Sequence, residues 1–237
     1  MLDLSILRTR QGMNSSTWQA PPLDGSLTLP EIFEYHSRHS PEHPLFVYPN
    51  DLQEPQYILY PEVYRGMRKA AKLVSTHYQH VQQKYDPDGG DDAPIVGILA
   101  TAGTHRVEKS VTELTKCGLP DSITYFTLMM GIMLLGFTPF PISTRNSAAG
   151  VAHLVRTTGV LRLFVSPDPA MQRLSKETIG ILAEDSIAVK LIPIPQFEDF
   201  YNGSNEDERV SFNKLRNDKL ALILHSSGEH SYNEPHS

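Results

Sequence analysis

The sequence predicts an α/β fold: a largely parallel sheet flanked by helices. Between residues 93 and 194, short apolar runs alternate with stretches of helical period. Such alternation is typical of βαβ units, whose crossovers make successive strands parallel and cover both faces of the sheet. The apolar runs are continuous, as expected for strands buried on both faces. A composition of 40% hydrophobic and 20% charged residues in 237 supports a globular protein.

The first elements precede this alternation. Residues 1–28 are polar and rich in turn formers, which predicts a flexible lead-in. A short helix is expected over 29–40, because Pro30 suits a first helical turn, where its missing N–H costs nothing. Two β-rich runs, 46–49 and 56–60, then predict a hairpin.

A long amphipathic helix follows the hairpin. Residues 61–85 carry apolar side chains at steps of three and four, which is the spacing of one helix face. An acidic, glycine- and proline-rich loop over 86–92 separates this helix from the first buried strand.

The alternating part resolves into four strands, three helices and a final strand. The expected strands are 93–100, 137–142, 161–166, 186–194 and 220–225, and the expected helices are 123–136, 147–159 and 168–185. Asp121 or Ser122 can cap the first of these helices and Gly136 can end it, while Asn146 or Ser147 can cap the second. A polar loop is expected between Pro193 and the final strand.

One apolar stretch allows a second interpretation. No charged residue lies between Asp121 and Arg145, and the stretch is nearly long enough to cross a bilayer. Its interleaved glycines, prolines and threonines, and a mean hydropathy of −0.29 for the chain, favour a buried helix followed by a buried strand.

Charge and cysteine content exclude several classes of protein. A net charge of −6 leaves no basic footprint for nucleic acid or for an anionic membrane surface. Cys117 is the sole cysteine, so neither an intrachain disulfide nor a cysteine-cluster metal site can form, and a reducing compartment is expected. The first residues lack the apolar core of a secretory signal. This feature and the single cysteine together predict a cytoplasmic protein.

The candidate binding site follows the final strand. Ser226, Ser227 and Gly228 come directly after the apolar run, and His225 precedes them. At the carboxyl edge of a parallel sheet, small hydroxyl residues and free N–H groups suit a phosphate ligand. An ordinary exposed turn is the alternative, since neither the Walker pattern nor G-x-G-x-x-G follows a strand.

Other reactive residues give weaker patterns, and no catalytic or metal-binding residue is assigned. Pro41 breaks the helix between His39 and His43, so the histidines near residue 40 form no recognisable ligand set. The acidic run 88–92 favours a solvated loop over a cation site. Cys117 has no activating neighbour, and His225 and Ser226, being adjacent on a strand, point to opposite faces.

The run into Ser226, Ser227 and Gly228 resembles the phosphate loop of the adenylate-forming superfamily, which includes acyl-CoA synthetases and peptide-synthetase adenylation domains. Residues 60–74 and 121–174 are similar to fungal enzymes of the aminoadipate-reductase kind. The resemblance implies the N-terminal subdomain of an acetyl-CoA synthetase-like adenylation domain, incomplete here. It also implies ATP and Mg²⁺ binding, with attack of a carboxylic acid on the α-phosphorus of ATP and transfer of the acyl group to a thiol, such as the phosphopantetheine of a carrier domain. His225, Ser226, Ser227 and Gly228 match the start of the nucleotide-binding loop.

Two stretches depart from the family pattern. After Gly228 the sequence reads EHSYNEPHS, without the lysine of the loop, and residues 101–120 are inserted where a short connection is expected. Retained introns explain both, and a natural short isoform or a degraded gene copy is the alternative. The expected organisation is therefore a lead-in at 1–28, a partial AMP-binding domain at 29–228 and an unrelated tail at 229–237. Such a chain is expected to be inactive, or to serve as a non-catalytic module that pairs with a full-length relative.

Overall fold

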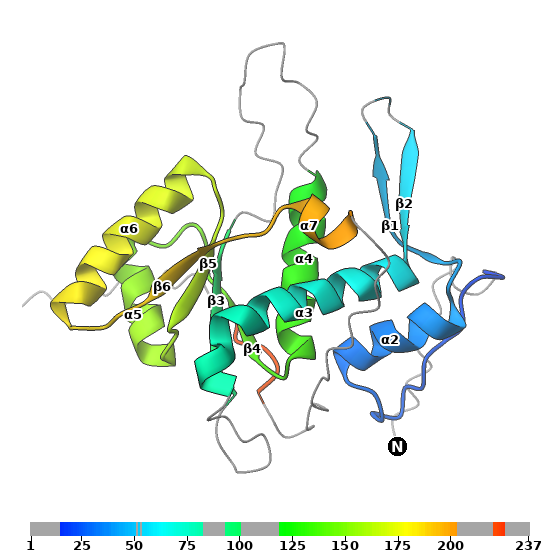
Figure 1. Ribbon diagram of the computed structural model, residues 1–237, viewed down its shortest axis with the longest axis horizontal. Coiled ribbons are helices and arrows are strands. Elements are labelled where there is room, and N and C mark those ends of the chain that lie inside the picture. Colours follow the sequence, from blue (N-terminus) through cyan, green and yellow to red (C-terminus); the bar gives the residue numbers. More distant parts are fainter. Residues whose placement is uncertain are drawn as a thin grey trace, which may run out of the picture.

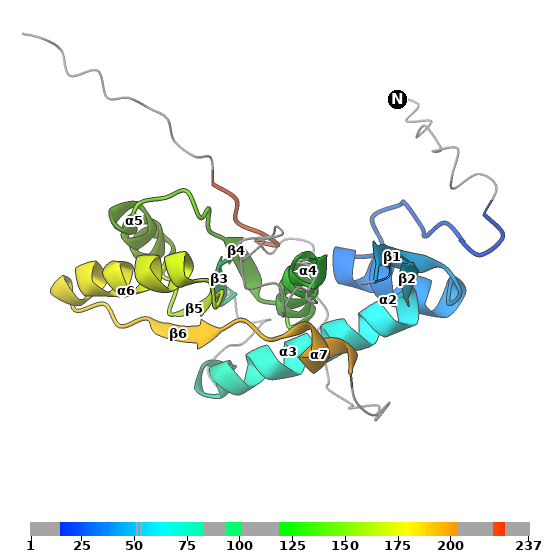
Figure 2. The ribbon, with the colours of Figure 1, turned by 90° about the horizontal axis from the view of Figure 1, so that it is seen from above.

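The computed structural model of the protein places a parallel sheet between two layers of helices (Figures 1 and 2). It describes residues 15–50, 52, 54–82, 93–100, 119–202 and 220–225. The elements in the sheet layers are β3 (Ile95–Leu99), α4 (Leu119–Leu134), β4 (Thr138–Pro141), α5 (Ala148–Thr158), β5 (Arg162–Val165), α6 (Pro169–Glu184) and β6 (Lys190–Pro193). The remaining elements are α2 (Leu29–His39), β1 (Pro44–Pro49), β2 (Pro55–Leu59), α3 (Tyr60–Gln82) and α7 (Phe197–Tyr201).

The sheet confirms the predicted fold class. Its four strands lie in the order β4-β3-β5-β6, and all neighbouring pairs are parallel. Helix α4 connects β3 to β4, α5 connects β4 to β5, and α6 connects β5 to β6. Each connection is thus a strand-helix-strand unit, as the alternation of apolar runs and helical periods predicts.

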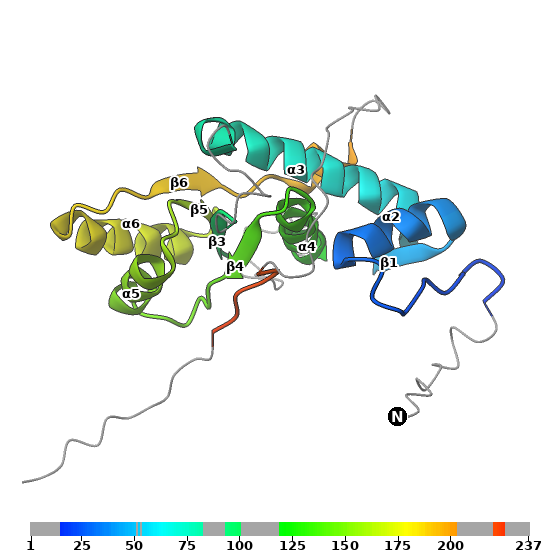
Figure 3. The same ribbon diagram turned by 90° about the horizontal axis from the view of Figure 1, so that it is seen from below.

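The two faces of the sheet bury separate apolar clusters. Ile98 and Phe164 pack with residues of α3 and α4 on one face. Leu163 and Val165 pack with residues of α5 and α6 on the other. Figure 3 shows the same arrangement from the opposite side, with the sheet between α3 and the pair α5 and α6. Because successive side chains of a strand point to opposite faces, β5 contributes to both clusters.

The elements before the sheet also match the sequence. Thr28 and Glu31 form a capping box at the start of α2, and β1 and β2 pair as an antiparallel hairpin. The hairpin forms its own two-stranded sheet, which Figure 1 shows standing beside α7. Helix α3 begins where the hairpin ends and packs along α4.

Helix α4 contains most of the uncharged, apolar stretch after Asp121 that allowed a membrane interpretation. It belongs to the buried cluster with α3, and Gly136, with φ of 79°, closes its C-terminus while its N–H bonds to the Met133 carbonyl at 2.9 Å. Within the part of the chain that the structure describes, no helix is long and apolar enough to span a bilayer.

Three details of the sequence-based prediction are wrong. Helix α4 begins at Leu119, so neither Asp121 nor Ser122 is its N-cap. The polar loop expected after Pro193 contains α7, whose Gln196 and Asp199 form a capping box. Strand β6 begins only at Lys190, because the turn after α6, with Ser186 at φ 58°, takes up the start of the predicted strand.

Candidate phosphate-loop edge

The candidate site is built where β3 and β4 end side by side. Ala100 follows β3, and Ser143 and Thr144 follow β4, at the carboxyl edge of the sheet. Residues 220–225 run along the outer side of β4, as Figure 3 shows for the orange-red segment. The Ile223 N–H donates to the Pro139 carbonyl at 3.1 Å. The final apolar run therefore enters this edge of the sheet, as predicted.

This segment does not form a full strand, which corrects the expectation from sequence. Thr138 and Ile142 direct their backbone N–H groups to carbonyls at β3, so in the alternation of a strand the backbone groups of Pro139 and Pro141 face the outer edge. Both residues are prolines and have no N–H to donate. Neither position can therefore donate a ladder bond to residues 220–225. Side chains supply others, including a bond from the Thr138 hydroxyl to the Leu220 carbonyl at 2.7 Å.

His225 completes the attachment of this segment. The Ser143 N–H, the first available donor beyond the two prolines, donates to Nε2 of His225 at 2.9 Å. Because a backbone N–H can only donate, Nε2 is the acceptor in this bond. The ring also meets Phe140 edge-on, with 5.8 Å between centroids. His225 thus fixes the backbone immediately before Ser226.

A shallow cavity of about 360 Å³ opens beside His225. Its walls are Ala100, Tyr125, Pro141, Ile142, Ser143, Thr144, Leu224 and His225. Burial raises the pKa of Tyr125 to about 12, so the phenol stays protonated at neutral pH and remains a hydrogen-bond donor. The lining holds hydroxyl groups and an imidazole but neither a carboxylate nor a cationic side chain of fixed charge.

The structure locates only part of the predicted site. His225 lies at the sheet edge, whereas Ser226, Ser227 and Gly228 fall outside the described residues. Cys117, the acidic run 88–92 and the inserted stretch up to residue 118 also fall outside them.

The histidines near residue 40 have other partners. His36 bonds the Ser40 hydroxyl, His39 bonds the Tyr35 carbonyl and His43 bonds the Thr17 hydroxyl. In the regions that the structure describes, no group of three or more His, Cys, Asp or Glu side chains could hold a metal ion.

Sequence reasoning missed Tyr125, Ser143 and Thr144. Ser143 and Thr144 follow a buried strand just as Ser226 follows residues 220–225, so the rule that selected Ser226 also selects them. Tyr125 carries no such signal, because it lies in an apolar helical stretch whose orientation depends on packing.

Comparison with known proteins gives related sequences over nearly the whole chain. The chain is 37% identical over 235 residues to an adenylate-forming reductase, Nps10, of Heterobasidion annosum, covering 95% of this chain and 19% of the relative. It is 31% identical over 154 residues to the adenylate-forming reductase Nps11 of Serpula lacrymans, covering 64% of this chain and 12% of the relative. The chain thus spans less than a fifth of the length of these relatives. No protein-family model matches it.

Solved structures share the fold at low sequence identity. The N-terminal domain of FACL13 from Mycobacterium tuberculosis matches with a TM-score of 0.53 and 14% identity, covering 86% of this chain and 42% of that domain. The anthranilate CoA ligase AuaEII, solved with anthranoyl-AMP, matches with a TM-score of 0.53 and 13% identity, over 84% of this chain and 31% of the ligase. These likenesses confirm the expected fold.

Proposed function

The chain belongs to the adenylate-forming superfamily, and on that premise we propose that residues 29–228 form the N-terminal part of an AMP-binding adenylation domain. The proposed activity of the whole enzyme is ATP-dependent activation of a carboxylic acid. A carboxylate oxygen bonds to the α-phosphorus of ATP, the bond from that phosphorus to the bridging oxygen breaks, and pyrophosphate leaves. The sulfur of a thiol, carried by the phosphopantetheine of a carrier domain, then bonds to the acyl carbon and gives up its proton, the bond from that carbon to the AMP oxygen breaks, and AMP leaves.

The observation that carries this proposal is the attachment of residues 220–225 to β4. It brings the end of the final apolar run, at His225, to the carboxyl edge of a parallel sheet, where backbone N–H groups and hydroxyls suit phosphate oxygens. Ser226, Ser227 and Gly228 come next in the sequence. We assign His225 the role of fixing the loop, and the two serines and Gly228 that of contacting the nucleotide. The described lining contains no carboxylate, so it does not fit Mg²⁺, and we assign no step to that ion.

We propose further that the 237-residue chain does not catalyse this reaction by itself. Departure of pyrophosphate requires positive charge near the phosphates. The described lining of the cavity supplies neither a lysine nor an arginine. ATP–pyrophosphate exchange with the isolated chain should therefore stay at background, and measurable exchange would contradict this statement.

We also propose a cytoplasmic location, because the lone Cys117 fits a reducing compartment.

A graft tests the assignment directly. Residues 29–228 replace the matching stretch of the Heterobasidion reductase, and ATP–pyrophosphate exchange is measured with its acid substrate. We expect exchange to persist in the graft. Ser226→Ala and Ser227→Ala should each lower it about tenfold or more, because each removes a hydrogen bond to a charged phosphate worth about 1.5–3 kcal/mol.

The control for the graft is Ser37→Ala, since the Ser37 hydroxyl donates to the Glu34 carbonyl within its own helix. Loss of activity in Ser37→Ala equal to that in Ser226→Ala would mean that the assay reports folding rather than phosphate binding. A graft that folds but shows no exchange would refute the adenylation-domain proposal.

A second function rests on exposed apolar side chains at the same edge. Leu220 and Leu224 are 56% and 72% exposed on the outer side of the sheet. Such residues favour a non-catalytic module that pairs with a full-length relative through this edge. Co-purification with that relative, lost in Leu224→Lys, would favour the interaction module, whereas an unaffected yield in the variant would count against it.

A further inference from the structure

Residues 15–20 cross helix α2 through an aromatic stack. The Trp18 ring stacks on the His36 ring with 5.6 Å between centroids and 25° between planes. His36 is 3% exposed, and its ring neighbours also include Tyr60, with 4.6 Å between centroids, and Tyr35, which meets it edge-on at 5.6 Å. The imidazole therefore lies between an aromatic ring of the N-terminal segment and one at the start of α3.

Hydrogen bonds hold the same segment at several points. The Gln19 N–H donates to the Ser40 hydroxyl at 2.9 Å, and the Thr17 hydroxyl lies 2.9 Å from Nδ1 of His43. The Tyr35 hydroxyl donates to the Ala20 carbonyl at 3.2 Å. The stack of Trp18 on His36 and these hydrogen bonds together hold residues 15–20 against α2.

The surroundings of His36 disfavour a charged imidazole. Burial lowers the pKa of His36 first, and the charges of His43 and His39 lower the pKa further. His39 lies on α2 and His43 in the loop before β1. From α3 the ring faces the phenol Tyr60, and from the N-terminal segment it faces the indole of Trp18.

Two opposing effects decide what protonation does. A cation over the face of a tryptophan gains about 0.5–1 kcal/mol at exposed sites. Placing a charge on a nearly buried side chain costs several kcal/mol when no opposite charge pairs with it, and the Ser40 hydroxyl, 3.2 Å from Nδ1 of His36, is a neutral partner. The desolvation cost therefore outweighs the attraction between the charged imidazole and Trp18. The charged form of His36 becomes more favourable when residues 15–20 undock and water reaches the ring.

We propose that residues 15–20 form a pH-sensitive latch, which is docked on α2 while His36 is neutral and released when His36 gains a proton. This device is independent of the proposed adenylation chemistry. When the medium becomes acidic, release of the latch exposes the surface around His36 and Tyr60.

The direction of the pH dependence follows from the lowered pKa. Above about pH 6.5, the ordinary value for histidine, the imidazole is neutral in both states and docking is unaffected. As pH falls below that value, the released state binds the proton first, because its histidine is solvated. Docking therefore weakens progressively as the pH falls below about 6.5. The weakening is complete once the pH is below the lowered pKa of His36 in the docked state.

The only tryptophan of the chain reports on the latch. Trp18 is the sole tryptophan in the 237 residues, so intrinsic fluorescence measures its environment directly. Between about pH 8 and about pH 5, we expect the emission of the full chain to shift to longer wavelength as the indole enters water. The far-ultraviolet circular dichroism should change little, since the helices remain folded.

Three variants make the test specific. His36→Phe keeps a ring between Trp18 and Tyr60 but cannot gain a proton, so the acid shift should disappear. His39→Asn removes one of the charges that lower the pKa of His36 and leaves the contacts of residues 15–20 in place, so protonation opposes docking less and the midpoint should move to lower pH. His153→Asn, at an exposed position of α5, alters the net charge of the chain equally and should behave as the unmodified protein.

Two results would overturn the latch. The first is an emission that stays constant over the whole pH range in the unmodified chain. The second is an acid shift that is the same in His39→Asn as in His153→Asn, which keeps the test decisive even if His36→Phe fails to fold. Light scattering on each sample separates the shift from association near the isoelectric point of about 5.9.

Discussion

Gly131 is the residue at which helix α4 approaches α3 most closely. A Cβ at this position would lie 2.5 Å from Cβ of Ala70 and 2.9 Å from the backbone nitrogen of Ala71. Gly131→Ala should therefore destabilise the protein by about 1–3 kcal/mol through overpacking, despite the better helix propensity of alanine. Urea unfolding, followed by circular dichroism, measures the change.

Gly180 on α6 provides the matched control. A Cβ there would meet no atom within 4 Å, so Gly180→Ala should stabilise the protein by about 0.5–1 kcal/mol. Equal effects of the two alanine substitutions would contradict the close helix contact at Gly131.

Single residues could be assigned from the sequence where the cause is local. Ser147 was one of two predicted caps, and its hydroxyl accepts from the Gly150 N–H at 3.2 Å, which settles the choice. The role of Gly131 could not be predicted, because it depends on Ala70 and Ala71, which lie some sixty residues earlier in the chain. Tyr125 was missed for the same reason.

At the scale of elements, His225 is expected to hold residues 220–225 against β4. His225→Ala removes the acceptor for the Ser143 N–H, and the bond from Ile223 to Pro139 loses its nearest support. Amide hydrogen exchange at Ser143 and Ile223 should accelerate several-fold, in line with the ~1 kcal/mol worth of a typical hydrogen bond. His153→Ala serves as the control, and unchanged exchange at Ser143 in His225→Ala would exclude the anchoring role.

The elements themselves were largely predictable, and the exceptions have physical reasons. Helices and buried strands from β3 to β6 follow from hydrophobic period, which reflects local burial. The final strand was predicted from its own apolar residues, but its pairing depends on the N–H groups of β4, which Pro139 and Pro141 lack. Helix α7 was missed because its five residues are too few to show a helical period, and its place depends on packing of Phe200 and Tyr201 against α3 and α4.

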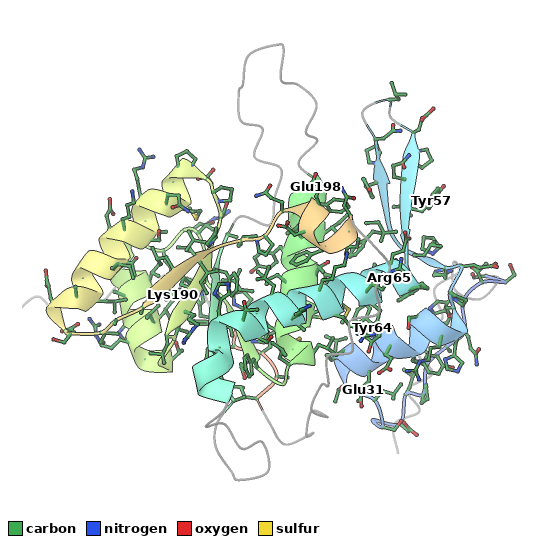
Figure 4. All side chains as sticks on the ribbon, viewed as in Figure 1. Glu31, Tyr57, Tyr64, Arg65, Lys190 and Glu198 are labelled. Atoms are coloured by element: carbon green, nitrogen blue, oxygen red, sulfur yellow. The ribbon has the colours of Figure 1, made fainter. Side chains whose placement is uncertain are left out.

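At the scale of the whole molecule, the sheet joins the two apolar clusters. Figure 4 shows side chains filling both sides of it, from α6 across to α3. Phe164 belongs to one cluster and Leu163 to the other, so loss of either cluster removes support from the same strand. This arrangement predicts that the two faces unfold together.

Leu182→Ala tests this coupling. Leu182 is fully buried on α6, in the cluster remote from Trp18, and its truncation should cost about 2–5 kcal/mol. Urea unfolding at about pH 8, where the latch is docked, should show the same loss by Trp18 fluorescence as by circular dichroism, because a two-state transition is seen equally by every probe. Leu182→Met, which nearly conserves volume, should cost less than about 1.5 kcal/mol. A Trp18 transition that stays in place while circular dichroism shifts would show that the α5 and α6 layer unfolds separately, and the shared sheet would then not couple the clusters.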